Sequence, residues 1–315
     1  LVKHGYKVTI FCTRDLDSPA YNLGSEVDIC VWNYQALRKV DLLVVCLDGK
    51  IAPFYILIGR MFCKVFYERH ISLLNIKTSY RGIYIALIQS LAERIVLLTN
   101  SSKIEWNNLR KIEVIPNPIS RNFLKDRLLN LDLQMDNSVN TKLLVIGRLT
   151  PQKGIDRAIK ILSLLPKNFT LTVIGNGSEL NELIKLSWEL EVQNRIEFID
   201  KATLNAEYYR NFDIFLLTSR YEGFGLVLLE ALYSGIKVLS FDVNFGPKDI
   251  LSTLGIENSL CGNNEISLMV DKIINEADTH LQSNEVMRRR KLIENIYSNK
   301  SILNKHIVMY ESIID

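Results

Sequence analysis

The stretch Ser219-Arg220-Tyr221-Glu222-Gly223-Phe224-Gly225-Leu226-Val227-Leu228-Leu229-Glu230-Ala231-Leu232 decides the fold of this chain. It follows the apolar run Ile214 to Leu217, which predicts a strand, and passes through glycines into an apolar helix. A strand, a turn and a helix in this order are typical of open α/β sheets, which bind ligands at the carboxyl ends of their strands. Because the N–H groups at a helix N-terminus favour anions, the stretch predicts a phosphate site.

Two glutamates mark this stretch, Glu222 where the strand ends and Glu230 inside the helix. A carboxylate among apolar side chains is costly unless it is paired or hydrogen-bonded. The hydroxyl groups of a ligand would satisfy Glu230, and a structural carboxylate that caps a nearby loop is the open alternative. Gly223 and Gly225 let the backbone approach a ligand closely. We therefore expect a phosphorylated, hydroxyl-rich ligand.

The rest of the chain predicts the α/β fold class. Short apolar runs predict strands, and helical stretches alternate with them, which is typical of parallel sheets covered on both faces. The first set of predicted strands comprises Val8–Cys12, Val27–Val31, Leu42–Leu47, Lys64–Tyr67 and Ile95–Leu98. The second set comprises Thr141–Ile146, Phe169–Ile174, Arg195–Phe198, Ile214–Leu217 and Lys237–Ser240.

The length of 315 residues suits two domains, and prolines mark the border between them. Pro116-Asn117-Pro118 excludes a helix and opens a polar segment that reaches Asn140. We expect a first domain at residues 1–117, a linker at 118–140, a second domain at 141–295 and a terminal helix at 296–315. Leu1 to Lys7 reads as the end of a helix that stops at Gly5, so we expect the sequence to begin inside a domain.

Composition excludes several classes of protein. A net charge of +3 gives no sign of nucleic-acid binding. The five cysteines form no C-x-x-C pair, so we expect neither a zinc site nor a disulfide framework, and reduced thiols indicate the cytoplasm. No signal peptide opens the sequence. The longest apolar run, Ile51 to Phe62, is too short to span a bilayer.

Three motifs carry a resemblance to a known family. Glu222 and Glu230 form an E-x7-E pattern, Gly147-Arg148-Leu149-Thr150-Pro151-Gln152-Lys153-Gly154 resembles a G-R-L-x-x-x-K-G loop, and Ser240 to Ile250 resembles S-x-D-x-x-x-G-P-x-[ED]-I. Together they resemble family 4 of the retaining glycosyltransferases, in the form found in bacterial enzymes that build surface glycans and glycosylate teichoic acids. The resemblance extends from about Val114 to Leu251.

The resemblance implies the GT-B architecture, in which two Rossmann-like domains face a cleft and a C-terminal helix crosses back to the first domain. The amphipathic run Ser301 to Ile314 fits that helix. The family has one more strand and a glycine-rich loop before the point where this sequence begins. We therefore expect the given sequence to bind nucleotide but to transfer sugar poorly, and an upstream segment to raise turnover.

The resemblance also assigns roles to residues. Arg148 and Lys153 match the pair that binds the donor diphosphate and stabilises the leaving group, which suits the affinity of basic side chains for phosphate. Glu230 matches a ligand of the ribose hydroxyls. Glu222 matches a residue beside the donor sugar, with either a contact to its hydroxyls or a more direct catalytic part. The turn residues at this site are Gly223, Phe224, Gly225 and Leu226.

Three further features have weaker matches. Asn244 and Gly246 belong to the loop that by resemblance faces the donor sugar, and Asp249 stands where many members have Glu. His70 follows a first-domain strand and is a candidate catalytic residue, with a structural histidine as the alternative. Gly175-Asn176-Gly177 either contacts the nucleotide or is a simple turn between a strand and a helix.

We expect no metal and no other cofactor, because Arg148 and Lys153 would supply the positive charge. Asp15-Leu16-Asp17 matches the D-x-D pattern of metal-dependent glycosyltransferases, and a solvated turn explains it better. Lys77, Arg81 and Arg94 interleave with apolar residues. They fit a buried helix with a charged outer face, and the alternative of peripheral contact with the inner face of the cytoplasmic membrane stays open.

The sequence thus predicts a cytoplasmic, retaining glycosyltransferase that moves a hexose or N-acetylhexosamine from a nucleotide-diphospho-sugar, most simply a UDP-sugar. The expected acceptor is a bacterial cell-envelope glycan, either lipid-linked or a teichoic acid. A hydrolase fits poorly, because it would leave the basic loop without a purpose. Two alternatives stay open: a sugar-nucleotide 2-epimerase of the same architecture, and a truncated nucleotide-binding module without turnover.

Overall fold

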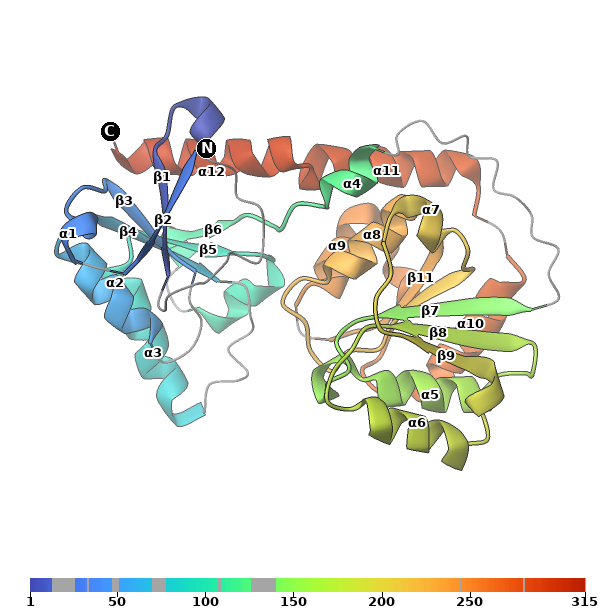
Figure 1. Cartoon of the computed structure of the whole chain (residues 1–315). Helices are drawn as coiled ribbons and strands as arrows, with labels where there is room; N and C mark the ends of the chain where they lie inside the picture. Colours follow the sequence, from blue (N-terminus) through green and yellow to red (C-terminus); the bar gives the residue numbers. More distant parts are fainter. Residues whose placement is uncertain are drawn as a thin grey trace. The chain divides into compact units, whose positions relative to one another are not determined.

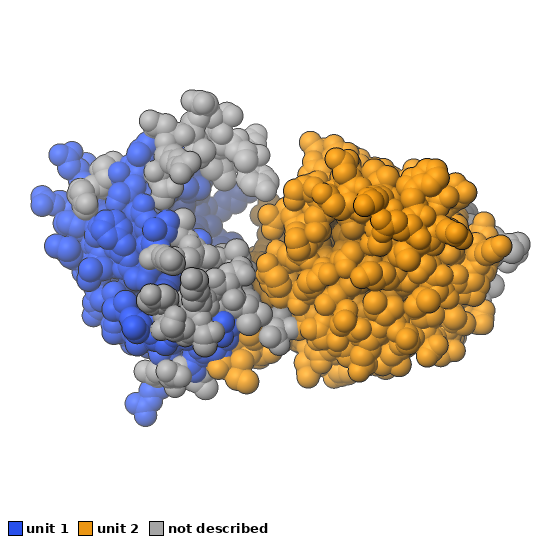
Figure 2. Space-filling view, turned by 90° about the horizontal axis from the view of Figure 1, so that it is seen from below, with its two compact units in different colours: residues 1–97, 105–115, 303–315 blue, residues 98–104, 116–302 orange. Residues whose placement is uncertain are grey.

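The computed structural model describes residues 1–12, 26–32, 34–46, 51–69, 78–106, 109–125, 140–243, 245–279 and 281–314. The chain divides into two compact units (Figure 2). Unit 1 comprises Leu1–Leu97, Glu105–Ile115 and Leu303–Asp315, and unit 2 comprises Leu98–Ile104 and Pro116–Ile302. No described helix is both long and apolar enough to cross a membrane.

Unit 1 contains two parallel sheets. Strands β1 (Val8–Cys12) and β2 (Val27–Val31) pair with each other. The second sheet has the order β3 (Leu42–Val45), β4 (Lys64–Arg69), β5 (Arg94–Leu97) and β6 (Ile112–Val114). Its helices are α1 (Tyr34–Leu37), α2 (Ala52–Arg60) and α3 (Thr78–Leu91). Short 3-10 helices lie at Val2–His4 and Leu109–Lys111, and the first ends at Gly5 with a φ of +87°, as its glycine predicts.

The core of unit 1 forms where α2 and α3 pack against the four-stranded sheet. Ile56 of α2, Ile88 of α3 and Tyr67 of β4 are fully buried in one apolar cluster. The C-terminal end of α12 (Asn299–Ile314) also belongs to this unit. Its Tyr310 ring lies 5.6 Å from the Phe66 ring of β4. The expectation that the C-terminal helix returns to the first domain is therefore confirmed.

Unit 2 contains one six-stranded parallel sheet, and helices cover both of its faces (Figure 1). Its strands have the spatial order β12 (Leu260–Cys261), β11 (Lys237–Phe241), β10 (Ile214–Leu217), β7 (Thr141–Ile146), β8 (Phe169–Ile174) and β9 (Ile196–Ile199). Every residue of β10 is buried. An uninterrupted apolar run is what a strand covered on both faces requires.

The two helical layers of unit 2 have separate cores. One core packs α5 (Ile155–Leu164), α6 (Leu180–Glu189) and α10 (Ile266–Ala277) on one face of the sheet. The other core packs α4 (Arg121–Lys125), α7 (Ala206–Tyr209), α8 (Leu226–Ser234), α9 (Pro247–Leu254) and α11 (Ser283–Tyr297) on the opposite face (Figure 1). Among the described residues, 3-10 helices of unit 2 lie at Pro151–Lys153, Gln193–Arg195 and Glu257–Ser259, and the 3-10 helix Ser101–Glu105 ends at the first residue of a unit 1 segment.

Every strand predicted from the sequence is present, with small shifts at the ends. Strands β6 and β12 were not predicted. They have three and two residues, which is too short for an apolar pattern to stand out.

Candidate active site

The candidate site lies at the point where the sheet of unit 2 changes direction. The chain runs from β7 outward to β8 and β9, and then returns to β10, which lies on the other side of β7. Neighbouring strands are parallel, so the loops after β7, β10 and β11 emerge at one edge of the sheet. A switch point of this kind is where open α/β sheets bind ligands. The three sequence motifs occupy these three loops.

Lys153 and Glu222 meet across the first two of these loops. The Lys153 Nζ donates a hydrogen bond to Glu222 Oε1 at 2.7 Å, and Ser219 Oγ donates to the same oxygen at 2.6 Å. The Lys153 and Glu222 side chains are 18% and 6% exposed. A Cβ at Gly147 would lie 3.2 Å from the Lys153 stem, so this glycine leaves room for the lysine. The two loops thus bring a cation and a carboxylate together.

Arg148 lies in the same loop as Lys153, but its side chain is exposed to solvent rather than paired with a carboxylate. Its side chain is exposed, and it makes no hydrogen bond or ion pair with the rest of the described chain. Its guanidinium is therefore available to an anionic ligand, which would gain two parallel hydrogen bonds from it.

The turn after β10 leads directly into α8. Gly225 precedes the helix with a φ of +96°, and no side chain in the described part of the chain caps the helix N-terminus. The first N–H groups of α8 consequently need partners from outside the helix. A Cβ at Gly246, in the loop after β11, would collide with the Phe224 carbonyl. Glycine at that position lets the second and third loops touch, and Leu226 at the start of α8 remains partly exposed.

Glu230 is a largely buried carboxyl group with a buried hydrogen-bond partner. Tyr209, which is fully buried on α7, donates a hydrogen bond from its hydroxyl to Glu230 Oε2 at 3.0 Å. Burial raises the pKa of Glu230 to about 7, although the Tyr209 hydrogen bond acts in the opposite direction. Burial and the neighbouring carboxyl group in turn raise the pKa of Tyr209. Glu230 therefore changes its charge near neutral pH.

The structure favours the structural interpretation of Gly175-Asn176-Gly177. A Cβ at Gly175 or at Gly177 would collide with the carbonyl of Gly147 or of Leu149. The Leu149 N–H donates to the Asn176 carbonyl at 2.8 Å. This turn therefore supports the Arg148 loop from behind. Asp249 likewise makes a structural contact, because its carboxylate accepts hydrogen bonds from the N–H and the hydroxyl of Ser101.

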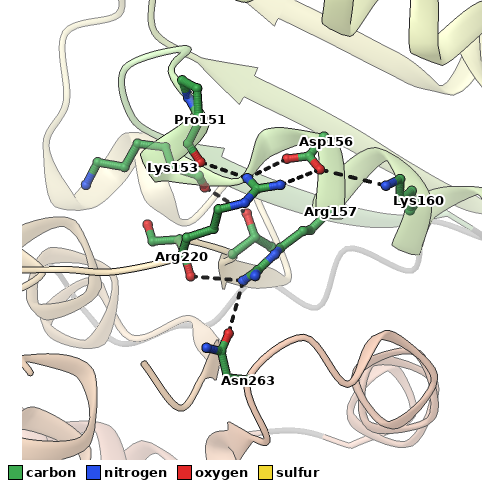
Figure 3. Close-up of polar contacts among 9 residues, drawn as sticks. Pro151, Lys153, Asp156, Arg157, Lys160, Arg220 and Asn263 are labelled. Carbon is green, nitrogen blue, oxygen red and sulfur yellow. Dashed lines mark hydrogen bonds and ion pairs between the residues drawn. The ribbon is translucent and has the colours of Figure 1, made fainter. Parts of the chain in front are cut away.

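Sequence reasoning missed several side chains that link the loops of the candidate site to the rest of unit 2. Arg220 forms a bidentate ion pair with Asp156, and the buried Arg157 reaches Asn263 (Figure 3). Tyr209 was also missed. No spacing rule predicts these pairs, because partners such as Arg220 and Asp156 meet only through the order of the strands. The charge of each residue is the only local signal, and a solvated surface explains such a charge equally well.

Several predicted residues lie outside the described part of the chain. These are His70, Asn244, Asp15, Asp17 and Lys77. Within the described residues, no group of three or more His, Cys, Asp or Glu side chains could hold a metal ion.

Comparisons with known proteins identify the family of this chain. The family model described as glycosyl transferases group 1 matches residues 136–298, about half of the chain. An uncharacterized glycosyltransferase of Haemophilus influenzae is 30% identical over 216 residues, which are 66% of this chain but only 58% of that protein. The amylovoran biosynthesis glycosyltransferase AmsD of Erwinia amylovora is 26% identical over 275 residues, or 81% of this chain and 77% of that protein.

Solved structures show the same fold. The lipopolysaccharide outer core galactosyltransferase WaaB, in its apo form, matches with a TM-score of 0.72 and 21% identity, covering 97% of this chain and 89% of WaaB. A TarM variant of S. aureus, in complex with fondaparinux, alpha-GlcNAc-glycerol and UDP, matches with a TM-score of 0.67 and 21% identity, over 85% of this chain and 55% of TarM. The expected GT-B architecture is therefore confirmed, and the chain belongs to the group 1 glycosyl transferase family.

Proposed function

We propose that this chain transfers a hexose or N-acetylhexosamine from a UDP-sugar to a bacterial cell-envelope glycan, with retention of the anomeric configuration. The observation that carries the proposal is the contact of Lys153 Nζ with Glu222 Oε1, at 2.7 Å, beside the switch point of the sheet. A cation suited to phosphate and a carboxylate suited to hydroxyl groups thus lie side by side, as a sugar nucleotide requires.

Transfer places negative charge on the departing nucleoside diphosphate. The exposed Arg148 and the neighbouring Lys153 would stabilise that charge in the transition state. The acceptor oxygen bonds to the anomeric carbon on the face from which the diphosphate departs. The bond between that carbon and the phosphate oxygen breaks, and the same phosphate oxygen takes the proton of the acceptor hydroxyl.

The remaining donor contacts are assigned to α8 and the turn before it. Glu230 Oε1 has no hydrogen-bond partner among the described residues, whereas Tyr209 occupies Oε2. We assign Glu230 Oε1 to the ribose hydroxyls and Glu222 to the donor sugar. The N–H groups of the turn from Gly223 to Leu226, at the start of α8, would face the diphosphate. Gly246 and Asn244 stay assigned to the sugar, and His70 remains a proposed catalytic residue.

The relatives support the class of acceptor. AmsD is named for amylovoran biosynthesis, WaaB for the lipopolysaccharide outer core, and TarM was solved with UDP and alpha-GlcNAc-glycerol. The family matched is one of transferases, which does not favour the 2-epimerase. We place the enzyme in the cytoplasm. Exposed apolar side chains of α2 and α3 support contact with the membrane, namely Phe54, Leu57, Ile83 and Leu87.

A donor panel tests this function. UDP-, GDP- and ADP-sugars are first compared by thermal shift, and those that stabilise the protein are then tested for release of the free nucleotide with glycan acceptors. We expect a UDP-sugar to stabilise most, and release of UDP to depend on the acceptor. Binding without release under every acceptor would instead support the nucleotide-binding module, and formation of an epimer would support the epimerase.

Variants of the basic loop connect the activity to the site. Arg148→Ala and Lys153→Ala each remove a charge-assisted phosphate contact, which is expected to cost about 1.5–3 kcal/mol in kcat/KM. Lys185→Ala is the matched control, because Lys185 is an exposed lysine on α6 with a single surface ion pair. Turnover of either loop variant at the wild-type rate would remove that residue from the mechanism.

A further inference from the structure

The loops that carry Lys153 and Glu222 are joined along their backbones. The Arg220 N–H donates to the Gln152 carbonyl at 2.7 Å, and Gln152 Nε2 donates back to the Tyr221 carbonyl at 3.2 Å. Thr218 Oγ1 donates to the Lys153 carbonyl at 3.3 Å. Hydrogen bonds from backbone and side chains therefore hold the loops after β7 and β10 together next to the candidate site.

The Arg220 guanidinium makes the strongest of these links. Its Nη1 donates to the Pro151 carbonyl at 2.7 Å and to Asp156 Oδ1 at 2.8 Å, and its Nη2 donates to Asp156 Oδ2 at 2.8 Å (Figure 3). Paired hydrogen bonds of this kind fix direction as well as distance. Burial tends to raise the pKa of Asp156, but Arg220, with smaller contributions from Lys160 and Arg157, outweighs this effect, and the pKa lies below its usual value. The pair is therefore ionised at neutral pH.

This ion pair is separate from the face that would hold the donor. The Lys153 side chain points away from Arg220 and Asp156 (Figure 3), and its Nζ donates to Glu222 Oε1. Arg220 stands two residues before Glu222 in the chain, and its guanidinium grips the carbonyl two residues before Lys153. Arg220 thus links the two loops close to Lys153 and Glu222, at a point two residues before each of them in the chain.

We propose that Arg220 and Asp156 are positioning residues, whose ion pair fixes the place of Lys153 against Glu222 and thereby sets the rate of transfer. The inference rests on the proposed function for its kinetic consequence only. In that function Lys153 acts chiefly on the charge that develops as the diphosphate departs. The other contacts to the nucleotide, from Arg148, Glu230 and the start of α8, are not touched by the Arg220 side chain. Loss of the pair should therefore affect kcat more than the binding of UDP.

Arg157 supports the same arrangement but is less suited to a test. Its Nη1 donates to the Ser219 carbonyl at 3.3 Å and to Asn263 Oδ1 at 3.2 Å, and its guanidinium lies 5.3 Å from the centre of the Phe241 ring. It is buried within the core, so its replacement endangers folding. Arg220 and Asp156 are partly exposed, and variants of them are expected to fold.

The kinetic test uses two variants. Arg220→Lys keeps the positive charge but cannot make the two parallel hydrogen bonds of a guanidinium, and Asp156→Asn keeps the shape of the side chain but loses its charge. Because a displacement of about 1 Å costs up to about 100-fold in rate, we expect kcat to fall about tenfold or more. The Kd of UDP should change less than about threefold, which is within about 0.7 kcal/mol. Lys160→Ala is the matched control, since the Lys160 ammonium pairs with Asp156 at 3.8 Å but touches neither loop of the site in the described chain, and should keep the wild-type kcat.

A second measurement does not depend on turnover. An ammonium group held in an ion pair should react slowly with an acylating reagent, so mass spectrometry after brief treatment with acetic anhydride tests the pairing of Lys153 with Glu222. We expect faster acylation of Lys153 in Arg220→Lys and Asp156→Asn, and no change in Lys160→Ala. Unchanged acylation, or equal losses in kcat and UDP affinity, would overturn the positioning role. If Lys153 is acylated faster in the two variants but the wild-type protein transfers no sugar, the proposed function is refuted. The role of the ion pair in positioning Lys153 would then still stand.

Discussion

Glu230 shows how one side chain acquires a functional property from its surroundings. It lies in an apolar helix, and burial raises its pKa to about 7 while the buried Tyr209 holds Oε2. An ordinary glutamate is ionised throughout the physiological range. Glu230 is instead divided between its two protonation states at neutral pH, so any ligand that needs the carboxylate will bind in a pH-dependent manner.

UDP binding should therefore tighten as the pH rises. Ribose hydroxyls donate hydrogen bonds, which the carboxylate accepts and the carboxylic acid accepts less well. With a pKa of about 7, the ionised fraction rises up to about tenfold between about pH 6 and pH 8. Calorimetry should show a Kd for UDP that falls by up to this factor and levels off above this range.

Glu230→Gln is the control for this titration. UDP has a titrating phosphate of its own, so part of the pH dependence belongs to the ligand and will persist in the variant. We expect the variant to bind UDP more weakly and with a smaller pH dependence. Glu222→Gln should keep UDP affinity and lose transfer. If the two variants exchange these behaviours, the assigned roles of the glutamates are wrong.

At the level of elements, the loop after β7 depends on a close approach of backbones. Gly154 precedes α5 with a φ of +61°, and a Cβ there would collide with the Thr218 carbonyl of the neighbouring loop. Positive φ and lack of space are two separate reasons for glycine. The chain also provides a position where only the first reason applies. Gly255, after α9, has a φ of +71°, and no atom lies within 4 Å of the place that a Cβ would take.

Gly154→Ala should therefore destabilise the protein more than Gly255→Ala. Both variants bear the strain of a left-handed alanine, about 1–2 kcal/mol, and only the first forces the two loops apart, at a further cost of about 1–3 kcal/mol. Urea unfolding of the wild type and of both variants measures the difference in their free energies of unfolding. Equal losses of stability would mean that the contact between residues 154 and 218 relaxes freely.

At the scale of the whole molecule, the sheet of unit 2 gathers positive charge at the candidate site from side chains and from a helix N-terminus. Arg148 and Lys153 come from one loop, and the uncapped N-terminus of α8 comes from another. The strand order in unit 2 brings these two loops together. The cationic side chains and the helix dipole can stabilise the negative charge on the departing diphosphate, so we expect the transfer to need no divalent metal.

We therefore predict that turnover persists in EDTA. The measurement is release of UDP with the preferred acceptor, before and after dialysis against the chelator, and the rates should agree. Addition of manganese to the dialysed protein is the control. If manganese restores an activity that EDTA abolishes, this prediction is wrong, and Asp15 and Asp17 become candidates for the metal ligands.

The sequence by itself determined most of the strands and the place of the candidate site along the chain. Apolar runs such as Ile214–Leu217 predict buried strands because burial on both faces leaves no polar positions. The glycines at 154, 225 and 246 mark turns because each has a positive φ, which other residues rarely adopt. The three motifs could therefore be placed after strands without knowledge of the tertiary structure.

Only the tertiary structure decided which loops are neighbours and what their side chains contact. The order β11, β10, β7 brings residues 153 and 222 together, although the sequence separates them by 69 positions. The pairing of Arg220 with Asp156 and the raised pKa of Glu230 also follow from it. These properties depend on burial and on distances through space, and local sequence patterns encode neither.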